Sequence, residues 1–348
     1  MGERSKVYMT DLRCRPGVSL LNKLEKLMRT AGIGEINFER KLVAIKMHFG
    51  EPGNLAFLRP NYAKVVADVV KSLGGVPFLT DCNTLYPGRR KNALEHLDAA
   101  YENGFSPLST GCQVIIGDGL RGNDDVEVPV EGAEYIQTAK IGKAIMEADV
   151  IISLSHFKGH EQTGFGGAIK NLGMGCGSRR GKMEQHAQGK PMVAPRRCVG
   201  CRRCATQCAH GAITFGEDRK ASIDWDKCVG CGRCIAVCNT DAIRPGNDAA
   251  MEELGCRMAE YAKAVVDGRP QFHISLVIDV SPYCDCHGEN DLPIVPDVGM
   301  FASFDPVALD IACADAVNAQ PVISNTCLSE ADHEGHDHFG AMFPTTDW

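Results

Sequence analysis

Eight cysteines stand in two runs whose spacing suits iron–sulfur chemistry. The first run is C-x2-C-x2-C-x3-C, and the same run recurs 30 residues later. Three thiolates on one tight loop can bind three irons of a cubane, and the fourth reaches across to the other cluster. The spacing therefore predicts two [4Fe-4S] clusters. One would be bound by Cys198, Cys201, Cys204 and Cys238, and the other by Cys228, Cys231, Cys234 and Cys208.

Zinc is the alternative metal for these cysteine-rich segments. Zinc ribbons use pairs of cysteines, however, and have no need for eight thiolates in two identical runs. A proline usually follows the fourth cysteine of the iron–sulfur run, and here Ala209 and Asn239 take that position. We expect this difference to alter the local turn and not the ligation. The segment is therefore predicted to be a bacterial-ferredoxin-like α+β domain that moves electrons one at a time.

The stretch that leads into the first run is basic in a chain whose net charge is −7. Its basic residues are Arg179, Arg180, Lys182, Lys190, Arg196, Arg197, Arg202 and Arg203, against the single acid Glu184. One interpretation is a solvated face that offsets the negative charge of a thiolate-bound cluster. The other is a docking surface for an acidic redox carrier such as a ferredoxin or flavodoxin.

Histidine, lysine and glutamate side chains follow two predicted strands where those strands end. Lys46 and His48 share a face by two-residue alternation. Open α/β sheets bind ligands at the carboxyl ends of their strands. A single histidine would more often be structural, but three histidines beyond two strand ends favour a site. The candidate catalytic residues are Lys46, His48, His156, Lys158, His160, Glu161 and Lys170, with Glu51 beside them.

Lys170 belongs to a glycine-rich run between Gly164 and Gly177. Backbone N–H groups in such a run can bind an anion at the start of a helix. The run matches neither the P-loop nor a clean dinucleotide fingerprint, so it is weak evidence for a nucleotide. The alternative is that the glycines allow close packing against a neighbouring element.

Cys284 and Cys286 form a further candidate metal site, outside the two runs. Residues i and i+2 point to the same side of an extended segment, so these thiolates could bind a metal together with His287 or Cys176. The alternative is a pair of reduced thiols near a loop. Six other cysteines lack such neighbours, and we expect most of them to be small buried hydrophobic residues. They are Cys14, Cys82, Cys112, Cys256, Cys313 and Cys327.

The elements that must position these residues form an α/β pattern. Short apolar strands alternate with amphipathic helices, which is typical of a mostly parallel sheet flanked by helices. Strands are predicted at Val7–Asp11, Leu42–Phe49, Pro77–Asp81, Val114–Gly117, Val150–Leu154 and Phe272–Val280. Helices are predicted at Ser19–Ala31, Arg59–Leu73, Asn92–Asn103, Ile141–Ala148, Met251–Val266 and Asp305–Val317, the last with Asp305 as N-cap and Pro306 in its first turn.

The cysteine runs interrupt this pattern, which divides the chain into three parts. Residues 1–189 and 247–348 would form one α/β body, and residues 190–246 would be an inserted domain with two [4Fe-4S] clusters. The segment with His333, His336 and His338 is polar, and we interpret it as a solvated loop with adventitious metal affinity.

Composition and charge exclude several classes of protein. Hydrophobic residues make up 44% of the 348-residue chain and charged residues 23%, as in folded soluble proteins. The mild negative charge argues against a nucleic-acid binder. No apolar run is long enough to span a membrane and no secretory leader is evident, so we expect a cytoplasmic location. An odd count of 17 cysteines argues against a disulfide framework and for metal or redox chemistry.

Three long stretches resemble a known family. They are KMHFGEPGN (46–54), SHFKGHEQTGFGGAIKNLGMGC (155–176) and CDCHGENDLPIVPDVGMFASFDPVALD (284–310). The sequence is similar to the domain of unknown function 362 family, whose ferredoxin-bearing members place two clusters within the same body. The resemblance implies an α/β body with an iron–sulfur insertion, and it implies no particular reaction.

We therefore expect an iron–sulfur redox protein whose clusters exchange electrons with a small-molecule substrate or metal site in the body, which could hold a further metal or organic cofactor. A non-enzymatic electron carrier is the first alternative. The second is a lactate-racemase-like metal-cofactor enzyme. It is suggested by a distant similarity of the Gly-Gly-x-x-Lys stretch at Lys170, and of the histidines, to an enzyme that joins a nickel-pincer cofactor to a lysine. The substrate and the oligomeric state do not follow from the sequence.

Overall fold

The centre of the body is a seven-stranded sheet with the order β1-β15-β14-β7-β2-β3-β4. The computed structural model describes residues 5–86, 88–187, 191–228, 230, 232–246, 251–331, 336–346 and 348. Five neighbouring strands run parallel, and β15 pairs antiparallel with β14 and β1. The strands are β1 (Tyr8–Thr10), β2 (Leu42–Lys46), β3 (Val76–Asp81), β4 (Gln113–Ile116), β7 (Val150–His156), β14 (Gln271–Val277) and β15 (Gly299–Ser303).

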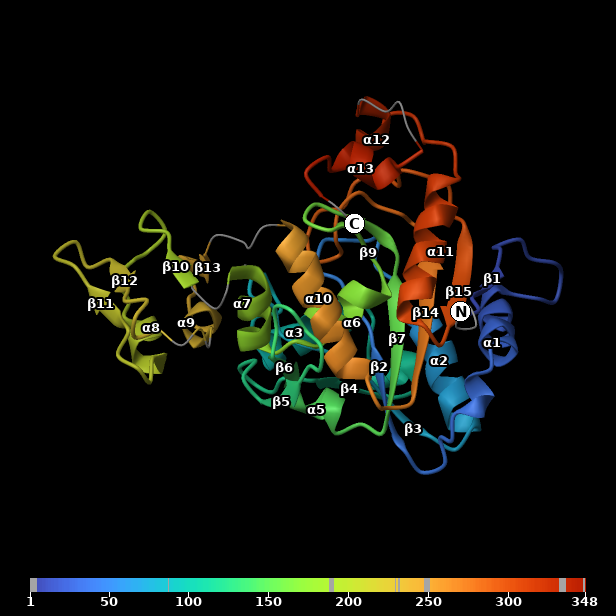
Figure 1. The fold of residues 1–348 in the computed structure, drawn as a ribbon, viewed down its shortest axis with the longest axis horizontal. Coiled ribbons are helices and arrows are strands. Elements are labelled where there is room, and N and C mark those ends of the chain that lie inside the picture. Colours follow the sequence, from blue (N-terminus) through green and yellow to red (C-terminus); the bar gives the residue numbers. More distant parts are fainter. Residues whose placement is uncertain are drawn as a thin grey trace.

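Both faces of the sheet are covered, because side chains alternate along each strand. Val43 and Ile45 of β2 pack with one helical layer, whereas Ala44 belongs to the core on the other face. The first layer contains α1 (Leu20–Thr30) and α2 (Pro60–Ser72), and the second contains α6 (Ala168–Cys176) and α10 (Met251–Val266) (Figure 1). A third apolar cluster packs α11 (Pro306–Asn318) beside α6, against β14 and β15.

Shorter elements complete the body. Two hairpins are formed by β5 (Asp125–Pro129) with β6 (Thr138–Gly142), and by β8 (Lys158–His160) with β9 (Gly164–Gly166). The remaining helices are η1 (Ile33–Glu35), α3 (Ala93–Glu102), α4 (Pro107–Thr110), α5 (Lys143–Met146), α7 (Arg179–Ala187), α12 (Cys327–Glu330) and α13 (His338–Met342). Within the described part of the chain, no helix is both long enough and apolar enough to cross a membrane.

The cysteine-rich segment projects from the body beside α7 and α10 (Figure 1). Its elements are β10 (Pro191–Val193), α8 (Arg203–Gln207), β11 (Ile213–Phe215), β12 (Ala221–Ile223), α9 (Arg233–Ala236) and β13 (Ile243–Pro245). The pairs β10–β13 and β11–β12 are antiparallel. Matched positions of the two cysteine runs share a left-handed backbone, with φ 63° at Arg202 and 67° at Gly232. The sequence repeat is therefore also a repeat of local structure.

The mostly parallel α/β body predicted from the alternating pattern is confirmed, and so is Asp305 as N-cap of α11, where it accepts bonds from Val307 N and Ala308 N. The helix predicted at Ile141–Ala148 is wrong. Ile141 lies in β6 opposite Val126, and only the four residues of α5 are helical. Burial alternates along β6, which is the two-residue period of a strand and not the period of a helix.

Candidate active site

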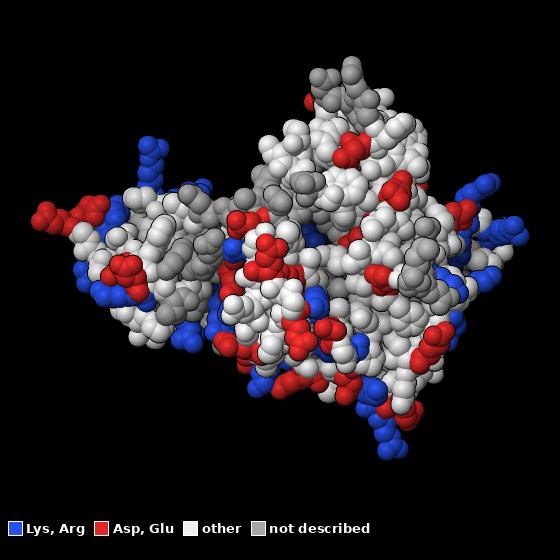
Figure 2. Space-filling model, in the orientation of Figure 1, with Lys and Arg blue, Asp and Glu red and all other residues white. Residues whose placement is uncertain are grey.

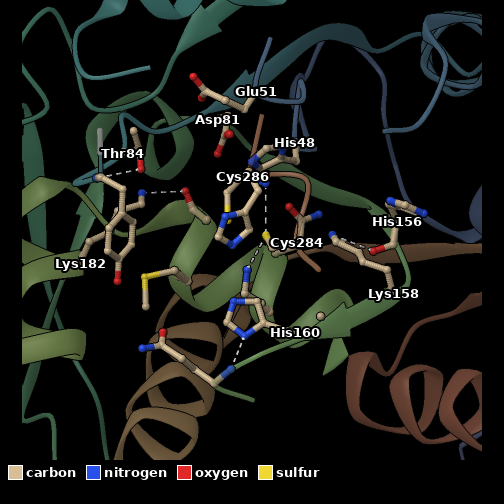
Figure 3. A pocket seen from close by; sticks show the side chains of 18 of the residues that line it. His48, Glu51, Asp81, Thr84, His156, Lys158, His160, Lys182, Cys284 and Cys286 are labelled. Atoms are coloured by element: carbon tan, nitrogen blue, oxygen red, sulfur yellow. Dashed lines mark hydrogen bonds between the residues drawn. The ribbon is translucent and has the colours of Figure 1, made fainter. Parts of the chain in front are cut away.

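A cavity of about 500 Å³ lies at the carboxyl ends of the parallel strands. This volume suits a small organic ligand. Its walls come from residues after β2, β3, β7 and β14 and from helices α6, α7 and α10. All seven candidate catalytic residues and both Cys284 and Cys286 line it, and Figure 3 shows the two cysteines near its centre.

Lys46 is fixed at the base of the cavity by polar partners. Its Nζ lies 3.0 Å from Asp81 Oδ1 at the end of β3 and donates to Asn171 Oδ1 at 2.7 Å. The side chain is 1% exposed, so the ammonium is compensated almost entirely by protein groups. Burial opposes ionisation of Asp81, but the neighbouring cations, Lys46 foremost, together outweigh it and hold the pKa of this carboxyl well below its usual range. Lys46 is thus a positioning group for α6.

His48 faces Arg90, a residue that the sequence did not single out. Arg90 Nε lies 2.7 Å from Glu51 Oε2, and its Nη1 lies 2.8 Å from His48 Nε2. Gly50 N donates to the other ring nitrogen at 2.9 Å. Burial and the Arg90 charge lower the pKa of His48 to about 3. The neutral ring has one acceptor nitrogen, so it can accept only one of these two contacts at a time.

His156 has a structural partner that the sequence also did not reveal. Its Nδ1 lies 2.9 Å from both carboxylate oxygens of Asp285, and its Nε2 lies 2.8 Å from Ile278 O. Both ring nitrogens face acceptors, the Asp285 carboxylate and the Ile278 carbonyl. Lys158 Nζ lies 3.3 Å from the same carboxylate. These contacts tie the loop after β14 to β7, and they leave His156 no free nitrogen for substrate.

His160 presents a free ring nitrogen to the cavity. Its Nδ1 accepts from Gln162 N at 3.2 Å, so the proton of the neutral ring lies on Nε2, and Thr163 Oγ1 lies 2.9 Å from the same Nδ1. Nε2 has no hydrogen-bond partner among the described residues. Burial, followed by the neighbouring Lys170 charge, lowers the pKa of His160 to about 3. A neutral imidazole at this position can donate a hydrogen bond to a ligand.

Lys170 and the two cysteines form a polar contact in the cavity. Lys170 Nζ donates to Cys284 Sγ at 3.2 Å. A hydrogen bond from Cys286 and the Lys170 charge hold the pKa of the Cys284 thiol well below its usual range, although burial opposes this. The same interaction raises the pKa of Cys286. Cys284 is therefore a buried thiolate stabilised by an ammonium, which is the state that attacks electrophiles and binds metals.

Two other groups proposed around this site have different partners. Glu161 Oε1 lies 2.9 Å from His287 Nε2, so these two residues pair with each other at the rim. Cys176 is the last residue of α6, is buried in the core and does not line the cavity. Across the described residues, no three histidine, cysteine, aspartate or glutamate side chains lie close enough to bind a single metal ion.

The glycines of the run at 164–177 allow close packing, as the alternative interpretation stated. A Cβ at Gly173 would lie 2.1 Å from Met258 O of α10, and one at Gly175 would lie 2.4 Å from Lys46 Nζ. Larger residues would separate α6 from α10 and from the cavity base. The amides at the start of α6, Ala168 N and Ile169 N, donate to Asp310.

The cysteines of the insertion gather in the two predicted sets. One small hollow is lined by Cys198, Cys201, Cys204 and Cys238, and a second by Cys208, Cys228 and Cys234. Cys231 lies outside the described residues. Backbone N–H groups of Ala221, Ala212 and Ala242 lie 3.2–3.4 Å from Sγ atoms of Cys198, Cys208 and Cys238. In a cubane each iron binds its own cysteine. A cluster site therefore does not require three thiolates close to one metal ion.

The basic stretch separates into groups with different surroundings. Arg179 is buried, Arg180 pairs with Asp125, and Lys182 lines the cavity. Lys190 lies outside the described residues. Arg196, Arg197, Arg202 and Arg203 are exposed around the exposed Cys201 and Val199. Figure 2 shows lysine and arginine side chains on the surface of the insertion. Of the described basic residues of this stretch, these four arginines are the exposed ones.

Helix α7 separates the cavity from the insertion. Lys182 and His186 line the cavity, whereas Met183 packs with Leu85 and with Cys198, Cys204 and Cys238. Arg179 approaches the second cysteine run, because a Cβ at Gly232 would lie 2.6 Å from Arg179 Cγ. The two sites therefore share one helix as a wall.

The remaining candidate residues have mixed surroundings. Cys82, Cys112 and Cys313 are buried as expected, Cys256 and Cys327 are partly buried, and Cys14 is exposed. His338 does not belong to a solvated loop, because it is buried at the start of α13 and its Nε2 lies 3.0 Å from Gln320 O. His333 lies outside the described residues.

Comparisons with known proteins place the chain in a family. A thylakoid-associated protein of Synechocystis sp. is 29% identical over 163 residues, which cover 45% of this chain and 46% of that protein. The lactate racemase apoprotein of Thermoanaerobacterium thermosaccharolyticum has a TM-score of 0.43 at 12% identity, covering 89% of this chain and 54% of that one. A protein from Thermotoga maritima has a TM-score of 0.39 at 13% identity, covering 88% and 59%.

The chain thus spans between about half and three fifths of the length of these proteins. A family model described as a domain of unknown function (DUF362) matches residues 43–315, which is most of the chain. The chain belongs to the DUF362 family.

Proposed function

We propose that the protein is an iron–sulfur oxidoreductase in which two [4Fe-4S] clusters exchange single electrons with a small molecule in the cavity of the body. The observation that carries the proposal is the arrangement of the cysteines. Residues far apart in sequence, such as Cys204 and Cys238, line one hollow, as the cross-over ligation of the repeated run requires. The second hollow has the three described members of the matching set, Cys208, Cys228 and Cys234.

The chemistry of the two hollows fits clusters better than zinc. Each hollow is bordered by a backbone N–H that points at a cysteine sulfur, and such bonds stabilise the negative charge of a thiolate-bound cluster. The left-handed residues Arg202 and Gly232 turn the chain tightly between the second and third cysteine of each run. When bound, the clusters would supply or accept electrons one at a time.

The cavity has the groups that a redox reaction of an organic molecule needs besides electrons. Lys170 can donate a hydrogen bond from its ammonium, the His160 ring can donate one through Nε2, and the Cys284 thiolate can stabilise or attack an electrophilic centre. The strand ends fix these groups, and the cavity encloses them. Helix α7 keeps the cavity next to the insertion, which favours exchange between the two.

The ligand sets can be tested by replacing cysteines one at a time and measuring iron, sulfide and EPR spectra after anaerobic purification. The intact protein should contain about eight irons and eight sulfides, because two cubanes hold four of each. Cys204→Ala and Cys238→Ala should lose the same cluster, and Cys208→Ala and Cys234→Ala the other. A protein that binds only zinc, after anaerobic reconstitution with iron and sulfide, would refute the proposal.

The role of the cavity can be tested separately. His160→Ala and Lys170→Ala should abolish substrate turnover while the cluster absorbance stays intact, because the cluster cysteines lie in another domain. If both variants exchange electrons with all partners at the unchanged rate, the protein is a carrier and the body only docks partners.

A lysine-linked metal cofactor is a second candidate, of the lactate-racemase-like kind. The observation in its favour is that the Lys170 amine lies inside the cavity with His160 and His186 also on its walls. The amine could attach a cofactor and the imidazoles could bind its metal. Intact-mass and metal analysis of protein from its native host distinguishes the candidates. An adduct that maps to Lys170 supports this one, and unmodified Lys170 in fully active protein rejects it.

A further inference from the structure

Lys182 differs from the other cations of the cavity in having no anionic partner. Lys46, Arg90, Lys158 and Lys170 contact Asp81, Glu51, Asp285 and Cys284 respectively. Among the residues that the structure describes, no carboxylate lies within ion-pair distance of Lys182. Its Nζ donates instead to two backbone carbonyls, at 2.6 Å to Gly177 O and 3.3 Å to Gly175 O.

The Lys182 ammonium is buried, since the residue is only 7% exposed. The acids that attract it from beyond ion-pair distance have closer partners: Asp81 pairs with Lys46, and Asp118 accepts from Asn83 N and Nδ2. A buried ammonium with two neutral acceptors keeps one unused N–H, which is costly in a protein interior. A negatively charged ligand in the cavity would accept from this N–H and form the ion pair that Lys182 lacks.

We propose that Lys182 binds the carboxylate of an organic acid, which is the substrate class of the cavity. A single ammonium with one unused N–H matches a monoanion. A phosphate dianion would leave an excess of negative charge, and amides at the start of α7, the helix that carries Lys182, already donate to Gly122 O and Ser178 Oγ.

The surroundings of Lys182 also indicate the rest of the ligand. Leu254 and Met258 of α10, together with Met174 of α6, form an apolar part of the cavity wall. Lys182 and Cys284 lie apart from each other across the cavity in Figure 3. A carboxylate at Lys182 would therefore place a short apolar chain along α10 and direct the far end of the molecule toward Cys284 and Lys170. The inference rests on the proposed function only in treating this cavity as the active site.

The experiment titrates the holoprotein with straight-chain carboxylates from acetate to octanoate and with the matching neutral amides, using saturation-transfer NMR and calorimetry. At least one carboxylate should bind about tenfold more tightly than its amide. Lys182→Met should lose this preference, and Lys182→Arg, which restores the charge, should regain most of it. Lys143→Met, at a half-exposed position of α5 that does not line the cavity, is the matched control and should bind as the wild type does.

Several results would overturn the inference. They are no binding by any acid of the series, equal binding of acid and amide, and unchanged binding to Lys182→Met. Inorganic phosphate that binds more tightly than every carboxylate would overturn the choice of ligand class. If Lys182→Met does not fold, Lys182→Gln serves in its place. Iron content is measured on the same samples, so a failure of the cluster assignment is seen independently of carboxylate binding.

Discussion

Asp118 shows how a buried carboxyl near the cavity sets a pH dependence. Its Oδ1 accepts both bonds from Asn83, and its Oδ2 has no hydrogen-bond partner among the described residues. Burial raises the pKa of Asp118 from 3.8 to about 6, although Lys182 opposes the shift. The native protein therefore binds more protons than the unfolded chain between these values, so this residue makes stability fall as pH rises through that window.

Asp118→Asn should remove this fall of stability with rising pH. The amide oxygen can accept both bonds from Asn83, and the NH2 group takes the place of the unpartnered oxygen. The variant should gain stability relative to the wild type as pH rises from about 4 to about 6, by up to roughly 3 kcal/mol at 1.36 kcal/mol per pKa unit. Denaturant unfolding at several pH values measures it. A constant difference in unfolding free energy across the range would contradict the shift.

Lys170 should control the reactivity of Cys284. The ammonium stabilises the thiolate, so Lys170→Met should raise the pKa of Cys284 and lower its thiolate fraction at neutral pH. A rise of one pKa unit slows alkylation about tenfold below both pKa values. Iodoacetamide labelling under anaerobic conditions, followed by peptide mass spectrometry, measures the rate against pH. The exposed Cys14 in the same digests is the internal control, and an unchanged profile for Cys284 would exclude the interaction.

At the scale of elements, the contact between α7 and the second cysteine run holds the insertion against the body. Gly232 has φ 67° and a Cβ there would lie 2.6 Å from Arg179 Cγ. Arg179 cannot move aside freely, because it is buried and donates to Arg121 O and Thr84 O. Gly211 has φ 59°, and a Cβ there would have no atom within 4 Å. Gly211→Ala therefore measures the cost of the left-handed backbone alone.

Gly232→Ala should therefore destabilise the protein more than Gly211→Ala. The left-handed backbone costs each variant about 1–2 kcal/mol, and the contact with Arg179 adds to this only at Gly232. Thermal unfolding measures the difference, and electron exchange between the insertion and the cavity should slow only in Gly232→Ala. Equal destabilisation by the two substitutions would show that α7 and the run do not depend on this contact.

Sequence patterns predicted the elements that carry the site better than the partners within it. His160 and Lys170 could be found because they follow a strand end and lie in a glycine-rich run. Asp285 could not, because its importance comes from His156, which lies 129 positions away in the chain. Arg90 and Lys182 likewise reach the cavity through packing of distant elements. Strand β15 was missed because its residues GMFAS are buried throughout and show no alternation.

For the whole molecule, the four exposed arginines and the cavity lie in different parts. Arg196, Arg197, Arg202 and Arg203 belong to the insertion, whereas the cavity lies in the body. Figure 1 shows the insertion projecting on one side of the body, with α1 on the opposite side. Both cysteine sets border α7, because Met183 packs with Cys198, Cys204 and Cys238, and Arg179 lies against Gly232. A partner that binds the arginines would therefore dock on the insertion and not at the cavity.

If this surface steers an acidic carrier, the rate of electron exchange should depend on charge. Arg202→Glu/Arg203→Glu should slow reduction by a flavodoxin by about tenfold or more at low ionic strength, because long-range attraction raises association rates by at least that factor. Raising the salt concentration should slow reduction of the wild type, so that the rates of the wild type and the variant converge.

Lys26→Glu/Arg40→Glu makes the same change in net charge at exposed positions of the body, remote from the insertion, and should have little effect on the rate. Stopped-flow measurement of all three proteins across a range of ionic strength distinguishes local steering from net charge. Rates that are independent of salt, or equal losses in the two double variants, would leave the four arginines as a solvated surface that offsets the charge of the neighbouring cluster.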